Sequence, residues 1–442
     1  MKKVYISTLG CSKNLVDSEM MLGSLLSDGY KNTHDVNEAE IAIVNTCGFI
    51  EAAKEESINE ILLIAKKKLD AKLQKLVVTG CLAQRYSKEL QEEIPEIDLI
   101  LGTTSFVDIV AQLEKLGERR EMKIDDIDKN IPSLARKLLT DTHTAYLKIA
   151  EGCDNLCTYC IIPKLRGKYR SRSMDEIVEE AKALAKQGVK EIILIAQDTT
   201  KYGLDNYKEA KLPELLSELD KIDGIRWIRI LYSYPEDITE ELVLTIKNSE
   251  KVLPYFDMPI QHAGDIVLKR MNRHTTKQQI EDKINMIRKH IPSASIRTTI
   301  IVGFPQETEE DFDILYRFVE KMKFDRLGTF EYSLEEGTPA AKMKGQIEPE
   351  VKADRKSRLM ELQQQISKDK NREWVGKVMS VLIENREDKN IYSGRSYRDM
   401  IEIDGLVFVH TNNKLKIGDF VEVRITDSLE YDLIGEENEH TK

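Results

Sequence analysis

The stretch Cys153-Asp154-Asn155-Leu156-Cys157-Thr158-Tyr159-Cys160 decides how the rest of this chain is interpreted. It spaces three cysteines as C-x3-C-x2-C, directly after a strand-like run at residues 144–150. One tight loop of this kind aims three thiolates at a single point, and such loops select iron–sulfur clusters or zinc. The polar residues Asp154, Asn155 and Thr158 argue against three buried structural cysteines.

Zinc is the alternative metal at this loop. A structural zinc ion takes four Cys or His ligands, but the nearest histidines are His143, on the far side of the strand, and the distant His262. A four-iron cluster held by three thiolates keeps one iron free of protein ligands. The ligand count therefore favours an iron–sulfur cluster over zinc.

Length and composition narrow the class of protein. The 442 residues exceed what one hydrophobic core organises, which predicts two to four domains. No apolar run approaches the roughly 20 residues of a membrane span, and the N-terminus reads as a strand, so we expect a cytoplasmic protein. Six cysteines there indicate metal binding or catalysis rather than disulfides. The net charge of −11 argues against a nucleic-acid surface and suits a basic protein partner.

Residues 1–115 alternate between strand-like and helical runs, which predicts a parallel, Rossmann-like α/β domain. Cys11, Cys47 and Cys81 each follow a strand directly and are about one βαβ unit apart. The carboxyl ends of parallel strands share one edge of the sheet, so the three thiols should converge there. Any one of them alone would be an ordinary small residue closing a strand. All three in the same position predict a second three-cysteine cluster.

Residues 116–143 are charged and irregular, and we predict a linker or a wrapping strand there, not a domain. The alternation resumes over 144–372, which predicts a partial (β/α)6 TIM-type barrel with its chemistry at the carboxyl ends of the strands. The basic run from Arg166 to Arg172 is either a solvated face or an anion holder. His262 and His274 are interpreted as structural. The strand-like runs are 144–150, 191–197, 226–232, 255–260, 296–302 and 327–332. The polar residues at or just past their carboxyl ends are Gln197, Asp198, Ser233, Gln261 and His262.

The last domain, residues 373–438, changes to a period-two pattern with turns, which predicts a small antiparallel β-barrel. From residue 373 to the end of the sequence, nine Lys and Arg stand against fifteen Asp and Glu. A surface that binds RNA should have the opposite sign. The acidic balance therefore indicates a Lys- and Arg-rich protein as the partner.

Together these motifs resemble the methylthiotransferase family of the radical S-adenosylmethionine (SAM) superfamily. The resemblance covers nearly the whole chain and is carried by C-x3-C-x2-C and by 9–19, 44–50, 78–85, 150–153 and 161–167. It implies a methylthiotransferase N-terminal domain, a radical SAM core and an OB-like TRAM barrel. It also implies two 4Fe–4S clusters. One is held by Cys153, Cys157 and Cys160, and binds SAM with Tyr159 near the adenine. The auxiliary cluster is held by Cys11, Cys47 and Cys81.

Within the family, the start Leu9-Gly10-Cys11-Ser12-Lys13-Asn14 is similar to the branch that modifies small-ribosomal-subunit protein twelve. That implies methylthiolation of the β-carbon of an aspartate, with two SAM molecules per turnover and no catalytic side chain. The implied partners are a basic ribosomal protein, free or in the ribosome, an electron donor and a sulfur donor. The alternatives are a tRNA-adenosine methylthiotransferase of the same family and a non-enzymatic iron–sulfur carrier. At 299–306 the sequence departs from the superfamily's G-x-I-x-G-x-x-E, with Gln306 at the glutamate position and Glu307 next.

Overall fold

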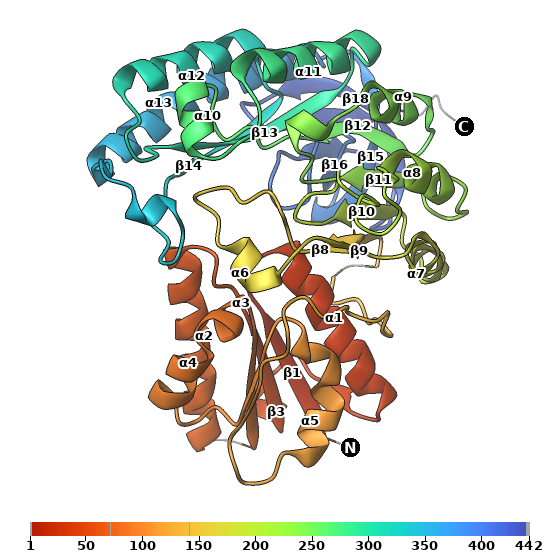
Figure 1. Ribbon diagram of the computed structural model, residues 1–442. Coiled ribbons are helices and arrows are strands. Elements are labelled where there is room, and N and C mark those ends of the chain that lie inside the picture. The colour runs from red at the N-terminus through yellow and green to blue at the C-terminus, as the bar shows by residue number, and fades with distance from the viewer. Residues whose placement is uncertain (1, 71, 141, 439–442) are drawn as a thin grey trace.

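The computed structural model describes residues 2–70, 72–140 and 142–438. The N-terminal domain is a parallel sheet in the order β2-β1-β3-β4-β5-β6 with helices on its faces (Figure 1). Its central strands are continuous apolar runs, as expected of a parallel sheet that is covered on both faces. The elements are β1 (Lys3–Thr8), α1 (Ser12–Ser27), β2 (Lys31–Asn32), β3 (Ile41–Thr46), α2 (Glu51–Asp70), β4 (Lys75–Gly80), α3 (Cys81–Arg85), α4 (Ser87–Glu93), β5 (Leu99–Leu101), α5 (Ile109–Lys115) and β6 (Glu121–Lys123).

The predicted parallel domain is confirmed, with one difference at its edge. Strand β6 lies inside residues 116–143, for which we predicted a linker or a wrapping strand, and it extends the sheet by pairing with β5. Its three residues Glu121, Met122 and Lys123 are half exposed or exposed, so the edge strand has no apolar signature. Residues 124–140 have neither helix nor strand.

The central domain is a second parallel sheet of six strands, in the order β14-β13-β12-β11-β10-β7. In the described chain β7 and β14 are its two free edges, so it is the partial barrel that the sequence predicts. Ser173 caps α7 as predicted, because its side chain accepts a hydrogen bond from the Glu176 N–H. The strands are β7 (Thr144–Lys148), β10 (Glu191–Ile195), β11 (Trp227–Ile230), β12 (Val252–Asp257), β13 (Ser295–Val302) and β14 (Arg326–Glu331).

Helices cover the outer face of this sheet, and a short strand pair lies beside the cysteine loop (Figure 1). These elements are β8 (Ala150–Glu151), α6 (Ile162–Arg166), β9 (Arg170–Ser171), α7 (Met174–Lys186), α8 (Leu212–Asp220), α9 (Glu240–Asn248), α10 (Asp265–Arg270), α11 (Lys277–His290), α12 (Glu309–Met322) and α13 (Pro349–Arg372). No helix in the described ranges has the length and apolar character needed to cross a bilayer.

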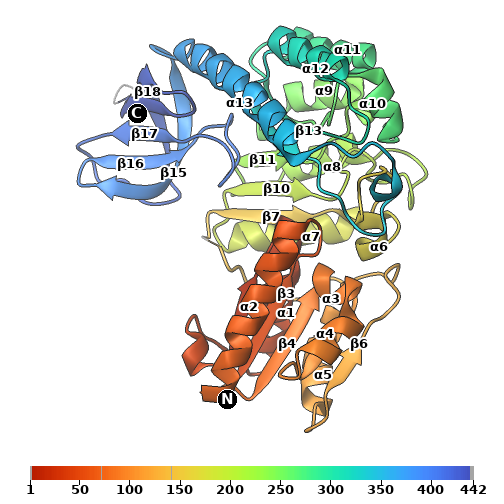
Figure 2. The ribbon, with the colours of Figure 1, turned by 90° about the vertical axis from the view of Figure 1, so that its left-hand side faces the viewer.

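The third domain is a closed barrel in the order β15-β16-β17-β19-β18, as predicted. Its strands pair antiparallel except for β17 and β19, which run parallel. Helix α13 lies between this barrel and the central domain (Figure 2). The strands are β15 (Val378–Asp388), β16 (Ile391–Arg395), β17 (Val407–His410), β18 (Phe420–Ser428) and β19 (Leu433–Glu437).

The two neighbours of the central sheet attach at its opposite ends. Glu191, the first residue of β10, binds Arg395 of the barrel. At the carboxyl ends of the strands, the N-terminal domain meets the central domain, with α1 packed on β7 and α3 packed on α6 (Figure 1). The carboxyl edges of both parallel sheets therefore face each other, which is where ligands bind in such folds.

Candidate active site

The first three cysteines lie together at the carboxyl edge of the N-terminal sheet. Cys11 is the N-cap residue of α1, Cys47 follows β3, and Cys81 begins α3. The loops touch: a Cβ on Gly10 would lie 2.7 Å from the Cβ of Cys47, so only glycine fits there. The structure thus brings the three side chains to one place, with Cys11 exposed and the other two buried.

Burial sets the acid–base state of these thiols. It raises the pKa of Cys47 to about 11, and it also raises the pKa of Cys81, with the neighbouring thiols adding to the shift. The Arg166 guanidinium opposes this shift without cancelling it, so Cys47 and Cys81 are neutral at pH 7. A bound metal centre would deprotonate them, because a coordinating thiol loses its proton outright.

The second triad lies in the loop between β8 and α6. The Cys153 N–H donates to the Gly167 carbonyl at 3.1 Å, and the Cys160 N–H donates to the Cys157 carbonyl at 3.0 Å. A Cβ on Gly152 would lie 2.0 Å from the Lys168 carbonyl oxygen, so the turn that presents the loop requires glycine. Burial raises the pKa of Cys153 to about 11 and raises that of Cys160 as well.

Aromatic side chains line the second triad. Tyr159 is half buried and packs against a cluster that includes Phe304 and Tyr332. The hydroxyl of Tyr234 lies 3.8 Å from the Cys157 sulfur, and the guanidinium of Arg273 lies 4.2 Å from the Tyr234 ring centroid. Sequence reasoning missed Tyr234, although it comes directly after Ser233 in the loop that follows β11.

The polar residues after the strands divide into two groups. Gln197 donates to Glu151 at 2.6 Å, and Asp198 accepts from Asn155 of the cysteine loop at 2.8 Å. These two therefore hold the loop in place. His262, in contrast, is fully buried, its Nδ1 accepts from the Gly264 N–H at 2.8 Å, and burial lowers its pKa to about 3. It is a neutral structural histidine.

A buried ionic network joins the two triads. Arg166, predicted only as part of a basic run, is 2% exposed. Its Nη1 donates to Asp17 of α1 at 2.6 Å and to Glu151 at 3.3 Å. Its Nη2 donates to Asn14, and its Nε lies 3.4 Å from the Cys81 sulfur. Arg166 is therefore no solvated residue but a link between the cysteine loop and the N-terminal triad.

Lys148 completes this network by donating to Asp17 at 2.6 Å and to Glu151 at 2.8 Å. Burial alone would raise the pKa of Glu151, but Lys148 and Arg166 hold it below its usual range. Two buried cations thus face two buried carboxylates. The sequence signal for Asp17 was its place in the 9–19 motif, whereas Lys148 had none.

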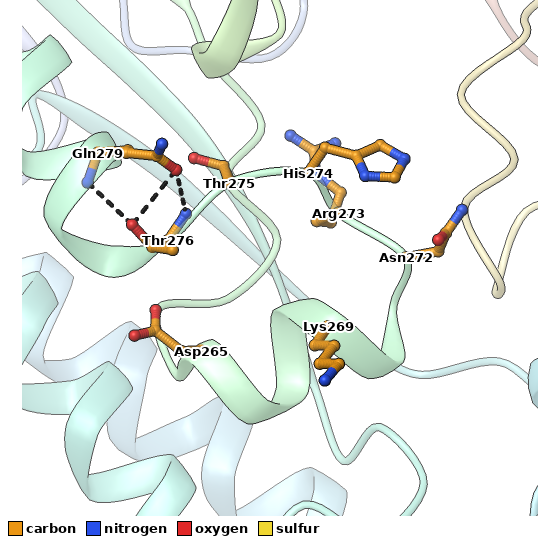
Figure 3. A pocket seen from close by; sticks show the side chains of 8 residues that line it. All are labelled: Asp265, Lys269, Asn272, Arg273, His274, Thr275, Thr276 and Gln279. Atoms are coloured by element: carbon orange, nitrogen blue, oxygen red, sulfur yellow. Dashed lines mark hydrogen bonds between the residues drawn. The ribbon is translucent and has the colours of Figure 1, made fainter.

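A polar hollow of about 520 Å³ opens beside the cysteine loop (Figure 3). Its rim anchors the loop, because Asn272 donates to the Leu156 carbonyl at 3.1 Å. Thr276 and Gln279 form the capping box of α11, drawn as dashed lines in Figure 3. No cysteine lines the hollow, so it borders the triads rather than containing them. Its residues are Asp265, Lys269, Asn272, Arg273, His274, Thr275, Thr276 and Gln279.

Comparison with known families assigns each domain. Residues 3–102 match the model described as "Uncharacterized protein family UPF0004", residues 147–319 match the radical SAM superfamily, and residues 375–437 match the TRAM domain. The chain is 55% identical to "Ribosomal protein uS12 methylthiotransferase RimO" of Clostridioides difficile (strain 630), over 99% of both chains. The chain belongs to the RimO family of radical SAM methylthiotransferases.

A second RimO-family relative, from Thermoanaerobacter sp. (strain X514), is 54% identical over 99% of this chain and 100% of its own. Among solved structures, the radical SAM methyltransferase TsrM from Kitasatospora setae, with cobalamin and a [4Fe-4S] cluster bound, superposes with a TM-score of 0.56. That match covers 77% of this chain and 74% of TsrM at 13% identity, so it shows the fold alone. The chain is thus an enzyme of the radical SAM class with a TRAM barrel.

Proposed function

We propose that this enzyme inserts a methylthio group at the β-carbon of an aspartate in ribosomal protein uS12. The observation that carries the proposal is the facing pair of cysteine triads joined by Arg166, which lies between Cys81 and the loop of Cys153. Relatives named as uS12 methylthiotransferases match 99% of the chain at 55% and 54% identity, which supports uS12 as the substrate.

Two 4Fe–4S clusters fit the donor sets. Cys153, Cys157 and Cys160 would hold one, and Cys11, Cys47 and Cys81 would hold the other, each with one iron free of protein ligands. A zinc ion fits less well, because each triad offers three thiolates, whereas a structural zinc ion takes four Cys or His ligands.

When bound, the two clusters and two SAM molecules supply the radical, methyl and sulfur chemistry, with an external electron donor and sulfur donor. The chain's own side chains bind and position. Tyr159, which packs against Phe304 and Tyr332, would lie near the adenine of SAM, and Asp198 fixes the loop through Asn155. No side chain is assigned as an acid or base, because hydrogen abstraction by a radical needs none.

The barrel suits a basic protein substrate. We assign residues 1–115 to the auxiliary cluster, 144–372 to the SAM-binding core and 373–438 to substrate recognition. Two basic and three acidic side chains of the barrel are buried, so most of its acidic excess lies outside the contact with the core: Arg395, Arg398, Glu384, Asp399 and Asp404. Carboxylates that face solvent attract Lys and Arg of a partner and repel phosphates.

The test is an anaerobic assay with reconstituted enzyme, reductant, SAM and sulfide, offered uS12 in one tube and bulk tRNA in another. Mass spectrometry should find a methylthio group on one aspartate of uS12 and unchanged tRNA nucleosides. A methylthio-adenosine product would contradict the proposal and assign the enzyme to tRNA. An iron-loaded protein that never cleaves SAM would indicate an iron–sulfur carrier. Cys157→Ala is the matched negative control.

A further inference from the structure

We propose that Lys13 is a substrate-binding residue whose ammonium group holds the carboxylate of the side chain being modified. The inference rests on the proposed function, which names an aspartate as that side chain. Lys13 is the second residue of α1 and follows Cys11 by two positions. Its side chain is enclosed, because the residue is only 7% exposed.

The ammonium of Lys13 has an aromatic neighbour but no anion. Its Nζ lies 3.2 Å from the centroid of the Tyr232 ring. Across the described residues it makes no hydrogen bond and no ion pair. The two other buried lysines of the described chain differ: Lys54 pairs with Glu51 and Glu335, and Lys148 pairs with Asp17 and Glu151. Lys13 is thus exceptional among them.

A largely enclosed ammonium without a counter-ion is costly, because it has lost part of its water and gained no opposite charge. A cation–π contact offsets only part of that loss. The nearby carboxylates cannot supply the rest, since Asp17 and Glu151 are already held by Lys148 and Arg166. Lys13 therefore has room for an anion from outside the chain.

A second observation at the same helix start also indicates an anion. The Ser12 hydroxyl is buried and has no hydrogen-bond partner among the described residues. It lies in the first turn of the 16-residue α1, where the N–H groups and the helix dipole favour negative charge.

The position of Lys13 between the two triads suits a residue that binds the side chain being modified. Asn14, the next residue, binds Arg166 and lies 4.0 Å from the Cys81 sulfur through its Oδ1. Tyr232 follows β11 and precedes by two residues Tyr234, which touches Cys157. The contact of Lys13 with Tyr232 thus spans the space between the two triads. A substrate group that must meet both centres lies there, and the exposed Cys11 marks the side open to solvent.

The test is a double-mutant cycle of binding, measured anaerobically without SAM on the reconstituted full-length enzyme. Labelled uS12 and its variant with the modified aspartate changed to Asn are the two ligands. The wild-type enzyme should bind the aspartate form at least about tenfold more tightly, the value of a charge-assisted hydrogen bond. Lys13→Met, an unbranched neutral replacement, should bind both forms equally. Lys13→Arg should restore most of the preference.

Lys68→Met is the matched control, because Lys68 is paired with Asp98 on the far side of the N-terminal domain. It should keep the full preference. The inference is overturned if Lys13→Met, with normal iron content and circular dichroism, still prefers aspartate. It is equally overturned if the variant loses only SAM affinity or only shifts the auxiliary cluster's potential, which would assign the cation to those groups. Failure of the proposed function is distinct, since wild type would then leave uS12 unmodified.

Discussion

Two buried ionic networks attach the central sheet to its neighbours, and they differ in what they leave unpaired. At the amino ends of the strands, Arg395 binds Glu191 at 2.5 Å and Glu384 at 2.7 Å, and Arg229 adds a second bond to Glu191 at 2.9 Å. Every charge in this barrel network has a partner inside the protein. It needs nothing from outside.

At the carboxyl ends of the strands, the network around Arg166 includes a thiol and borders an ammonium without an anion. A network that only holds domains together should be fully satisfied, because each orphaned group costs stability. Lys13, the buried ammonium without a carboxylate, lies beside the crevice between the triads. The difference teaches that the missing counter-ion of Lys13, rather than buried charge as such, sets the crevice network apart from the network around Arg395.

The largest expected effect distinguishes the two cysteine triads by the reaction that each supports. Cys81→Ala should reduce methylthiolated uS12 to background while SAM cleavage continues, because the second triad is intact. Cys157→Ala should abolish both. Product by mass spectrometry and 5′-deoxyadenosine by chromatography are the readouts. Continued methylthiolation by Cys81→Ala would refute the role assigned to the N-terminal triad.

Breaking either network should destabilise the fold by similar amounts. Arg395→Met leaves Glu191 and Glu384 short of a cation, and Arg166→Met does the same to Asp17 and Glu151, each at about 3–5 kcal/mol. Thermal unfolding followed by circular dichroism measures this, with the exposed Arg386→Met as control.

Only the crevice change should alter a cluster. Arg166→Met removes the N–H that lies 3.4 Å from the Cys81 sulfur, so the reduction potential of the auxiliary cluster should fall. Potentiometric titration followed by electron paramagnetic resonance tests this. An equal fall of the reduction potential in Arg395→Met would contradict the distinction between the two networks.

The barrel network around Arg395 should affect how the stability of the fold decreases at acid pH. Burial alone would raise the pKa of Glu191, but Arg395 and Arg229 lower it to about 2. Because the pKa of Glu191 is lower in the folded than in the unfolded protein, its carboxylate stabilises the fold at pH values above the unfolded pKa near 4.5. This contribution is lost as the pH falls toward 2. The loss is about 3 kcal/mol. Melting temperatures from pH 6 to 3 should fall less steeply in Glu191→Gln, and an unchanged slope would contradict this assignment.

The smallest effect is expected where an ion pair between the barrel and the core meets solvent. Lys368 of α13 binds Glu430 at 3.0 Å, and both side chains are more than a third exposed. Lys368→Met should change the free energy of unfolding by less than about 0.5 kcal/mol, because solvent screens the pair. A loss comparable to that of Arg395→Met would show that exposure is no guide here.

The sequence predicted what depends on local pattern. The strands, the caps and the six cysteines follow from periodicity, from Ser173 before an acidic turn and from the spacing of thiols. It could not predict which charges are buried. Arg166 looks like its neighbours Lys168 and Arg170 in the sequence, and its contact with Asp17 spans 149 positions. The sequence did not place strand β6 within residues 116–143, because its edge position tolerates charge.

The barrel is attached to the central sheet at a fixed distance from the crevice between the triads. The barrel network holds the first residues of β10 and β14, through Glu191 and Arg326, while the crevice lies past the other ends of the strands. With roughly 3.3 Å per strand residue, the sheet separates the barrel from the crevice by a fixed length. If the barrel recognises the substrate as proposed, the substrate must present its basic surface and its reactive side chain that far apart. In that case a short peptide containing only the reactive residue would contact the crevice alone, whereas the folded protein would contact both the crevice and the barrel.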